Sequence, residues 1–227
     1  MKPSAFVFDA YGTLFDVTAA ARRAAADDPS GLLQQIWPRL ADDWRRKQLE
    51  YTWLRTIMRQ HADFAEVTAA ALDWAMEAQG LGADHALRQK LLALYDQLDA
   101  FPEVAGVLTR LRETGVPLAI LSNGTPGMLK SAIDHAGLGD LLTAALSVEE
   151  VGIYKPAAKV YAMVEARLQV PPSKVLFVSS NGWDVAGAAH FGFQTAWVNR
   201  GNAPLDRLPH VPRHILKDLT PLADLMK

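Results

Sequence analysis

Residues 5–13 read AFVFDAYGT, an apolar run that stops at an aspartate. The first four of these residues are apolar without alternation, which is typical of a central strand in a parallel sheet, because such a strand is covered on both faces. Three later stretches have the same character, so we predict further strands over residues 117–121, 174–178 and 194–198. Asp9 then follows the first strand at the carboxyl edge of the sheet, where ligands of open α/β folds bind.

Helical patterns separate the predicted strands. Apolar residues recur at helical spacing over residues 103–114, and Gly115 follows as a stop signal. Residues 157–168 and 185–191 are also predicted to be helical. Strands that alternate with helices indicate an α/β fold built on a doubly wound, Rossmann-like parallel sheet.

One long segment, residues 16–99, contains no strand pattern. The helices predicted within it span residues 31–59, 64–79 and 86–98. We therefore predict an all-helical cap inserted after the first strand, with a discontinuous core formed by residues 1–15 and 100–227. The proline-rich tail after residue 200 is predicted to be irregular.

The composition excludes several classes of protein. The 227 residues include 23 Lys and Arg against 25 Asp and Glu, a net charge of -2, which argues against a nucleic-acid partner. There is no cysteine, which excludes disulfides, thiolate catalysis and cysteine-based metal sites. Asp9 interrupts the apolar start too early for a signal peptide, and no apolar run approaches the roughly 18 residues of a membrane helix. We expect a cytoplasmic protein with no membrane partner.

Polar residues follow three of the predicted strands, in the segments DAYGT (9–13), SNGT (122–125) and SSNGWD (179–184). A fourth polar segment, YKP (154–156), precedes the helix predicted over residues 157–168. Each alone would pass as an ordinary loop. Together they would bring carboxylates, hydroxyls, amides and a lysine to one edge of the sheet, which indicates a catalytic site.

In order and context, Asp9, Ser122, Lys155 and Asp184 resemble the motifs of the haloacid dehalogenase superfamily. The segments that resemble its L-2-haloacid dehalogenase (type II) branch are FDAYGTLFDV (8–17), WRRKQLEYTWLR (44–55), LSNGTP (121–126), YKPAAKVY (154–161) and FVSSNGWD (177–184). This resemblance runs the length of the chain. It implies the superfamily core with a helical cap, a small 2-haloacid as substrate and a homodimer.

The residues also favour a dehalogenase over a phosphatase of the same superfamily. Phosphatases normally carry a general-acid aspartate two residues after the nucleophile, and Tyr11 stands there. A halide needs no proton to leave. Ser179, Ser180 and Asn181 stand where metal-binding acids are expected, and only Asp184 remains acidic. The sequence therefore predicts a site without a metal or any other cofactor.

The reaction that the resemblance implies is a displacement through an ester. Asp9 attacks the halogen-bearing carbon of an L-2-haloalkanoate from the face opposite the halide, and this carbon inverts. Water then attacks the carboxyl carbon of Asp9. The configuration is inverted only once, so the product is a D-2-hydroxyalkanoate.

Arg45 is predicted to clamp the halide and the substrate carboxylate, a role that the resemblance implies. Its planar guanidinium suits both anions. Without the resemblance, the basic run from Arg45 through Arg46 to Lys47 would pass as a solvated helix face. The family often has glutamine where this chain has Arg46, which leaves the substrate preference open.

The other predicted ligands of the substrate come from the strand ends. Ser122 and Asn123 are expected to hold the carboxylate and the halide, with the backbone amides of Ala10 and Tyr11. Tyr161 is expected to support the site from behind. The apolar wall of the pocket is assigned to Tyr11, Leu49, Phe64 and Trp183.

The remaining catalytic assignments concern charge and water. Lys155 is expected to lie near Asp9 and keep it charged, and Thr13 is expected to bond the same carboxylate. Ser179 and Asn181 are candidates for placing the hydrolytic water or for fixing Asp9. Asp184 would orient Lys155 or the water. The sequence does not decide which group acts as the general base, and Asp184 is the candidate we favour.

Two other functions stay open at this point. A phosphatase of the same superfamily would hydrolyse phosphomonoesters with magnesium. A non-catalytic binder of small carboxylates would keep its affinity when Asp9 is changed to Asn and would release no halide. If the protein is a dehalogenase, the sequence leaves open which halogen and chain length it prefers and whether it acts on fluoroacetate.

Overall fold

The computed structural model describes residues 2–226. Its core is a six-stranded sheet in which all neighbouring strands run parallel, in the order β3-β2-β1-β4-β5-β6. The strands are β1 (Ala5–Phe8), β2 (Leu118–Ser122), β3 (Ala144–Ser147), β4 (Val175–Ser179), β5 (Gln194–Val198) and β6 (His214–Leu216). The predicted α/β fold with a doubly wound parallel sheet is confirmed.

The central strand β1 is buried along its whole length, as its unbroken apolar sequence predicts. In register, Phe8 pairs with Ile120 of β2 on one side and with Val178 of β4 on the other. The backbone amide of Asp9 donates to the carbonyl of Val178 at 2.9 Å. Asp9 therefore leaves the sheet at its carboxyl edge, directly beside the end of β4.

Two strands escape the sequence prediction, and both lie at an edge of the sheet. Ala144 and Ala145 leave β3 only partly covered, so this strand lacks the apolar run that marks a central one. The prediction of an irregular tail is wrong in part, because residues 214–216 form β6 and residues 220–226 form a 3-10 helix. β6 is three residues long and partly exposed, so no apolar pattern marks it.

The core helices connect the strands. They are α5 (Val104–Arg112), α6 (Pro126–His135), α7 (Ala158–Leu168) and α8 (Gly182–Phe191). Short 3-10 helices span Gly139–Leu141, Val148–Glu150, Pro172–Lys174 and Thr220–Met226. α6 was not predicted, although the Thr125 hydroxyl accepts a hydrogen bond from the Met128 amide and Pro126 occupies the first turn, both of which are helix-start signals.

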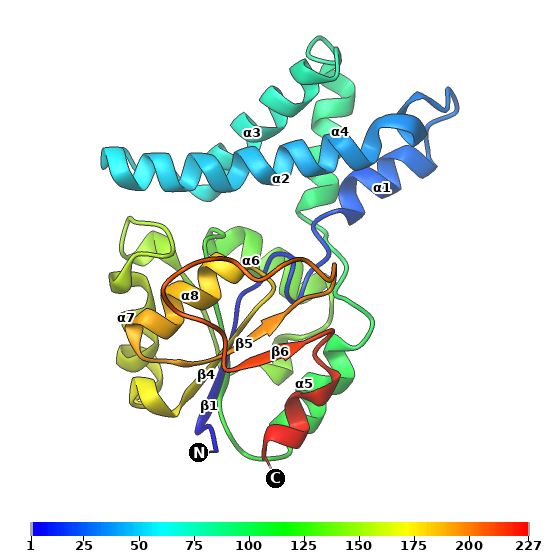
Figure 1. Ribbon diagram of the computed structural model, residues 1–227. Coiled ribbons are helices and arrows are strands. Elements are labelled where there is room, and N and C mark those ends of the chain that lie inside the picture. Colours follow the sequence, from blue (N-terminus) through cyan, green and yellow to red (C-terminus); the bar gives the residue numbers. More distant parts are fainter. Residues whose placement is uncertain (1, 227) are drawn as a thin grey trace.

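A separate layer of helices covers the carboxyl edge of the sheet (Figure 1). It consists of α1 (Ala19–Ala26), α2 (Leu32–Met58), α3 (Phe64–Ala78) and α4 (His85–Tyr95). α2 is 27 residues long and crosses the whole layer. α1 was not predicted as a separate helix from its alanine-rich sequence. No helix among residues 2–226 has the length and apolar character needed to cross a membrane.

The chain passes between the two layers at two adjacent points. Phe15 forms an isolated antiparallel bridge with Ala100. On either side of this bridge, the amide of Asp16 donates to the carbonyl of Asp99 at 2.9 Å, and the amide of Phe101 donates to the carbonyl of Leu14 at 2.9 Å. The helical layer therefore begins and ends at one place beside the carboxyl edge of the sheet.

Candidate active site

A buried lysine joins two carboxylates at the carboxyl edge of the sheet. Lys155 Nζ donates to Asp9 Oδ1 at 3.1 Å and to Asp184 Oδ2 at 2.9 Å. Both Lys155 and Asp184 are fully buried, whereas Asp9 keeps a small exposed fraction of 6%. Burial favours the neutral amine, but the charges of Asp184 and Asp9 outweigh this effect and raise the pKa of Lys155 above its ordinary value of 10.5. The lysine therefore stays charged beside Asp9.

The second oxygen of the Asp9 carboxylate is held from two other segments. Thr13 Oγ1 lies 3.0 Å from Asp9 Oδ2, and Asn181 Nδ2 donates to the same oxygen at 3.0 Å. With Lys155 on Oδ1, three donors from three segments fix the orientation of this carboxylate.

The loop after Asp9 turns back on itself to bring Thr13 into place. The carbonyl of Ala10 accepts hydrogen bonds from the amides of Leu14 and Phe15. Gly12 has a φ of +89°, a left-handed conformation that favours glycine. The backbone amide of Ser180 also donates to Thr13 Oγ1 at 2.8 Å, so the loop is tied to the end of β4.

Asp184 is held from behind by a tyrosine. Tyr161 OH donates to Asp184 Oδ1 at 2.7 Å, while Lys155 occupies the other oxygen. Tyr161 is fully buried, and burial raises its pKa well above the ordinary value of 10.0, so the phenol keeps its proton. Tyr161 therefore holds the oxygen of Asp184 that Lys155 does not contact.

The polar residues after β2 and β4 shape the loops around the lysine. Ser122 Oγ accepts a hydrogen bond from the Gly124 amide at 3.0 Å, and Asn123 Oδ1 accepts one from the backbone amide of Lys155 at 3.1 Å. In the same way, Ser179 Oγ accepts one from the Asn181 amide at 3.1 Å. The Ser122 and Ser179 bonds each close a turn within one loop. The Asn123 bond joins the loop after β2 to the loop before α7 and positions Lys155.

Arg45 reaches from α2 to the loop that follows Asp9. One terminal nitrogen of its guanidinium donates to the carbonyl of Tyr11 at 3.1 Å, and the other donates to Gln48 Oε1 at 2.8 Å. Gln48 is buried and donates in turn to the Thr68 hydroxyl at 2.7 Å. Sequence reasoning missed Gln48, whose role depends on contacts with distant helices.

The neighbouring Arg46 points to a different environment. It donates to Asp43 at 2.8 Å, lies 3.6 Å from Glu50, and its guanidinium stacks over the Trp74 ring at 5.0 Å. Its side chain is 52% exposed. Arg46, which stands where the family often has glutamine, therefore lies on the outer face of α2.

Aromatic rings form the wall between the two layers. The Tyr11 ring lies 5.6 Å from that of Phe64 and stacks on that of Tyr95 at 5.7 Å. Burial, together with the nearby Tyr95 phenol, raises the pKa of Tyr11 well above 10.0, so this residue is a poor proton donor. Gly124 permits the close approach, because a Cβ atom there would lie 2.6 Å from the Tyr11 ring.

A second aromatic contact links α2 to the start of α8. Trp53 meets Trp183 edge to face, with ring centroids 5.3 Å apart. Trp53 follows Arg45 and the half-buried Leu49 at intervals of four residues, so these side chains share one face of α2. That helical spacing was the signal available for Trp53, which sequence reasoning did not single out.

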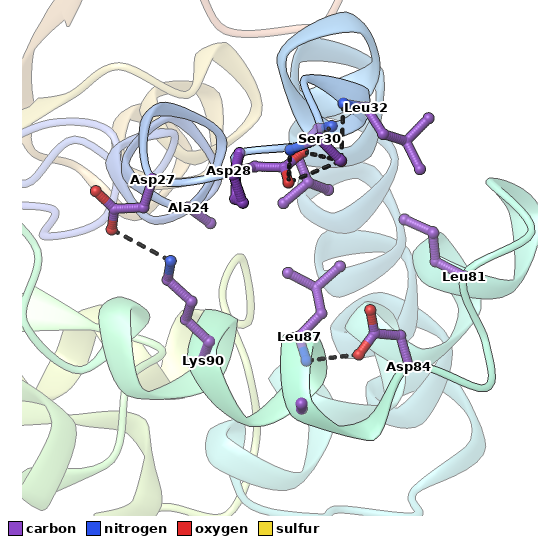
Figure 2. A pocket seen from close by; sticks show the side chains of 12 residues that line it. Ala24, Asp27, Asp28, Ser30, Leu32, Leu81, Asp84, Leu87 and Lys90 are labelled. Atoms are coloured by element: carbon purple, nitrogen blue, oxygen red, sulfur yellow. Dashed lines mark hydrogen bonds and ion pairs between the residues drawn. The ribbon is translucent and has the colours of Figure 1, made fainter.

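The prominent hollow drawn in Figure 2 lies within the helical layer, away from these residues. It has a volume of about 320 Å³, and its carboxylates are already engaged. Asp27 pairs with Lys90 at 3.2 Å, and Asp84 accepts the Leu87 amide at 2.9 Å. Among residues 2–226, no cluster of three or more His, Asp or Glu side chains is arranged to hold a metal ion.

Two (S)-2-haloacid dehalogenases match almost the whole chain. The family model of the haloacid dehalogenase-like hydrolases matches residues 3–192. (S)-2-haloacid dehalogenase 1 of Pseudomonas sp. (strain CBS-3) is 44% identical over 222 residues, which cover 98% of this chain and 96% of the relative. (S)-2-haloacid dehalogenase H-109 of Pseudomonas putida is 38% identical, with 99% and 98% covered.

Solved structures show the same similarity. The L-2-haloacid dehalogenase RSc1362 is 40% identical and superposes with a TM-score of 0.92 over 100% of this chain and 99% of that one. The L-2-haloacid dehalogenase of Xanthobacter autotrophicus with chloropropionic acid covalently bound is 36% identical, with a TM-score of 0.88 and 98% of each chain covered. The chain therefore belongs to the haloacid dehalogenase-like hydrolases and, within them, to the (S)-2-haloacid dehalogenase family.

Proposed function

We propose that this protein is an (S)-2-haloacid dehalogenase that hydrolyses short L-2-haloalkanoates to D-2-hydroxyalkanoates and halide. The observation that carries the proposal is the hold on Asp9 by Lys155, Thr13 and Asn181, with Arg45 reaching the next loop. The sequence relatives bear this enzyme name, and one solved neighbour carries covalently bound chloropropionic acid.

In the first step, an Asp9 oxygen attacks the carbon that carries the halogen. A carbon–oxygen bond forms as the carbon–halogen bond breaks, and the halide leaves with the electron pair. Each carboxylate oxygen can accept two hydrogen bonds, so Thr13 and Asn181 fill Oδ2, while Lys155 leaves one lone pair free on Oδ1 for this attack. Arg45 stabilises the negative charge that develops on the halide.

In the second step, water attacks the carboxyl carbon of Asp9. The bond between that carbon and the oxygen attached to the substrate then breaks. This oxygen takes up one proton of the water and the other proton is released, so Asp9 returns to a carboxylate and the hydroxyacid keeps an oxygen that came from Asp9. Ser179 and Asn181 stand at the end of β4, where they can place this water. Both oxygens of the buried Asp184 are bonded to Lys155 or Tyr161, which supports a role in orienting Lys155 rather than direct contact with water.

The substrate carboxylate is assigned to Ser122 and to the backbone amides of Ala10 and Tyr11. The Ser122 hydroxyl accepts the Gly124 amide and can donate its own hydrogen to the ligand. The alkyl group of the substrate would pack against the wall of Tyr11, Leu49, Phe64 and Trp183. In this proposal the helical layer serves as a cap, since Arg45 and Phe64 both belong to it.

The proposal extends to assembly and compartment. We propose a homodimer in the cytoplasm. Leu54, Ile57 and Met58 support a dimer, because they expose 44%, 76% and 58% of their surface along one side of α2, where a second copy would cover them. The absence of cysteine supports a reducing compartment. Light scattering on the purified protein measures the oligomeric state directly.

The deciding experiment measures halide release from L-2-chloropropionate and, separately, from the D isomer, both in buffer containing EDTA. We expect chloride and D-lactate from the L isomer alone. A single turnover in heavy-oxygen water should label Asp9 and leave the lactate unlabelled. Absence of halide from both isomers and from bromoacetate and fluoroacetate would overturn the proposal, and magnesium-dependent hydrolysis of phosphomonoesters would replace it with a phosphatase.

A further inference from the structure

A second cavity opens between the helical layer and the core, at the end of α2. It has a volume of about 270 Å³. One wall comes from the last turn of α2 and the residues after it, Arg55, Arg59 and His61, and the other from the loop before α7 with Lys159. Arg55 stands ten residues after Arg45 on the same helix, which is roughly 15 Å along its axis. Neither Asp9 nor any of the side chains bonded to it lines the cavity, which is therefore separate from the candidate active site.

The lining of this cavity is basic. Arg55, Arg59, His61 and Lys159 line it, and no aspartate or glutamate does. Outside the lining, Arg55 lies 3.6 Å from Glu66, and His61 lies 2.9 Å from Glu149. Neither Arg59 nor Lys159 has a carboxylate partner within the described residues 2–226. In a chain with a net charge of -2, this is a local excess of positive charge.

The local backbone explains how these side chains meet. Arg59 ends α2 in a left-handed conformation, with a φ of +56°, which turns the chain back across the end of the helix. Gly152 has a φ of +62° and turns the opposite loop. Lys159 is the second residue of α7, so the positive end of that helix dipole adds to its charge. The turns at Arg59 and Gly152 thus bring cationic side chains from two segments into the same cavity.

The same seam already carries polar contacts between the layers. The Tyr154 hydroxyl donates to the carbonyl of Ala62 at 2.5 Å, and the Tyr154 amide donates to the Thr56 hydroxyl at 3.3 Å. Lys155 follows directly in the chain and contacts Asp9. A ligand at this seam would therefore touch both layers, one loop away from the buried lysine.

We propose that this cavity is a second anion site, which takes a small oxyanion of the carboxylate or phosphate type. Guanidinium and ammonium groups give oxyanions charge-assisted hydrogen bonds, and the cavity volume suits a ligand of few atoms. Because the cations come from both layers, the bound anion stabilises their observed arrangement. The site lies beyond the proposed dehalogenase reaction and does not depend on it.

The test uses inorganic phosphate as the probe, with calorimetry for affinity and the melting temperature for stabilisation. In the double variant Arg59→Gln/Lys159→Gln, we expect phosphate affinity to fall by about tenfold or more, with loss of the rise in melting temperature. Arg45→Gln removes a cation from the candidate active site and should leave phosphate binding unchanged. Arg167→Gln removes a charge from the last turn of α7 and serves as the matched control.

Parallel titrations with D-lactate distinguish the two sources of the anion. Lactate binding that survives in Arg45→Gln and is lost in the double variant would identify the product of the proposed reaction as a ligand. If phosphate binding survives in Arg45→Gln and is lost in the double variant, and lactate does not bind, inorganic phosphate would be identified as the ligand. If neither anion binds, or if Arg45→Gln abolishes binding while the double variant keeps it, the proposal is wrong. None of these outcomes depends on whether the protein releases halide.

Discussion

The backbone amide of Phe64 donates to Glu149 Oε1 at 3.2 Å, across the seam between the helical layer and the core. The other oxygen of this carboxylate lies 2.9 Å from His61 Nε2. Phe64 packs against Tyr11 in the wall of the candidate active site. Glu149 belongs to the core and is not part of the candidate site, yet it helps to position Phe64, which belongs to the helical layer.

Glu149→Ala should therefore weaken substrate binding more than turnover. Loss of the charge-assisted bonds costs about 1–3 kcal/mol, which corresponds to a KM for L-2-chloropropionate raised by roughly 5- to 160-fold with kcat little changed. Glu149→Gln keeps an acceptor for the Phe64 amide and should stay close to wild type. Steady-state kinetics on both variants checks this, and an unchanged KM in Glu149→Ala would show that Phe64 is held by other contacts.

Arg45→Lys should lose about 100-fold or more in kcat/KM while the fold is retained. A lysine lacks the planar guanidinium fork whose two terminal nitrogens reach Tyr11 and Gln48 and whose shape fits the substrate. Arg46→Gln is the matched control, because Arg46 pairs with Asp43 on the outer face of α2. Equal losses in the two variants would contradict the assignment of Arg45. Circular dichroism verifies that both fold.

Lys155→Met should destabilise the protein as well as abolish halide release. Without the lysine, the carboxylates of Asp9 and Asp184 lie buried near each other with no cation, at a cost of about 3–5 kcal/mol in the free energy of unfolding. The double variant Lys155→Met/Asp184→Asn removes one of these charges and should recover part of that loss. Urea denaturation measures both. A double variant less stable than the single one would mean that repulsion between the carboxylates is not the cause.

The stability should fall in alkaline solution. Burial raises the pKa of Tyr11, Tyr95, Tyr154 and Tyr161 above the ordinary value of 10.0. The unfolded chain therefore releases these protons at a lower pH than the folded one, so stability is full below about pH 10 and is lost as the pH rises through the folded values. The melting temperature between pH 8 and pH 11 tests this, and the absorbance of ionised tyrosine should rise together with unfolding.

Tyr154→Phe provides the control for the alkaline transition. It removes one of these phenols, so the melting temperature should fall less steeply with pH than in wild type. It also removes the hydrogen bond to Ala62, so its melting temperature at pH 8 should be lower. A pH dependence identical to that of wild type would exclude Tyr154 from the group that causes it.

The sequence could predict those parts of the fold that a local pattern determines. β1 is continuously apolar and central, and its end placed Asp9 at the edge of the sheet. β3 and β6 lie at the edges, where partial exposure removes that pattern. α6 was missed although two signals were present, the cap at Thr125 and the helical spacing of the apolar residues Met128, Leu129, Ala132 and Ile133.

The candidate site shows the same limit. Asp9 and Asp184 follow predicted strands, so the topology placed them at one edge of the sheet. Lys155 follows the unpredicted β3, and only the family resemblance indicated that it lies near Asp9. Gln48 and Glu149 act through contacts between segments far apart in the chain, and no motif marks them. Arg45 and Arg46 are adjacent in the sequence, yet a helix turns them to different faces, and only the packed structure shows which one faces the core.

The bridge between Phe15 and Ala100 also bears on how the chain reaches its native state. β1 must pair with β2, and the partners Phe6 and Leu118 are more than a hundred residues apart. A loop of that length is costly to close from an open chain. The intervening helices begin and end at one point. Their early assembly would therefore reduce the effective length of the loop between β1 and β2 to a few residues. We therefore expect substitutions between α2 and α3 to slow refolding of the sheet, although neither helix belongs to it.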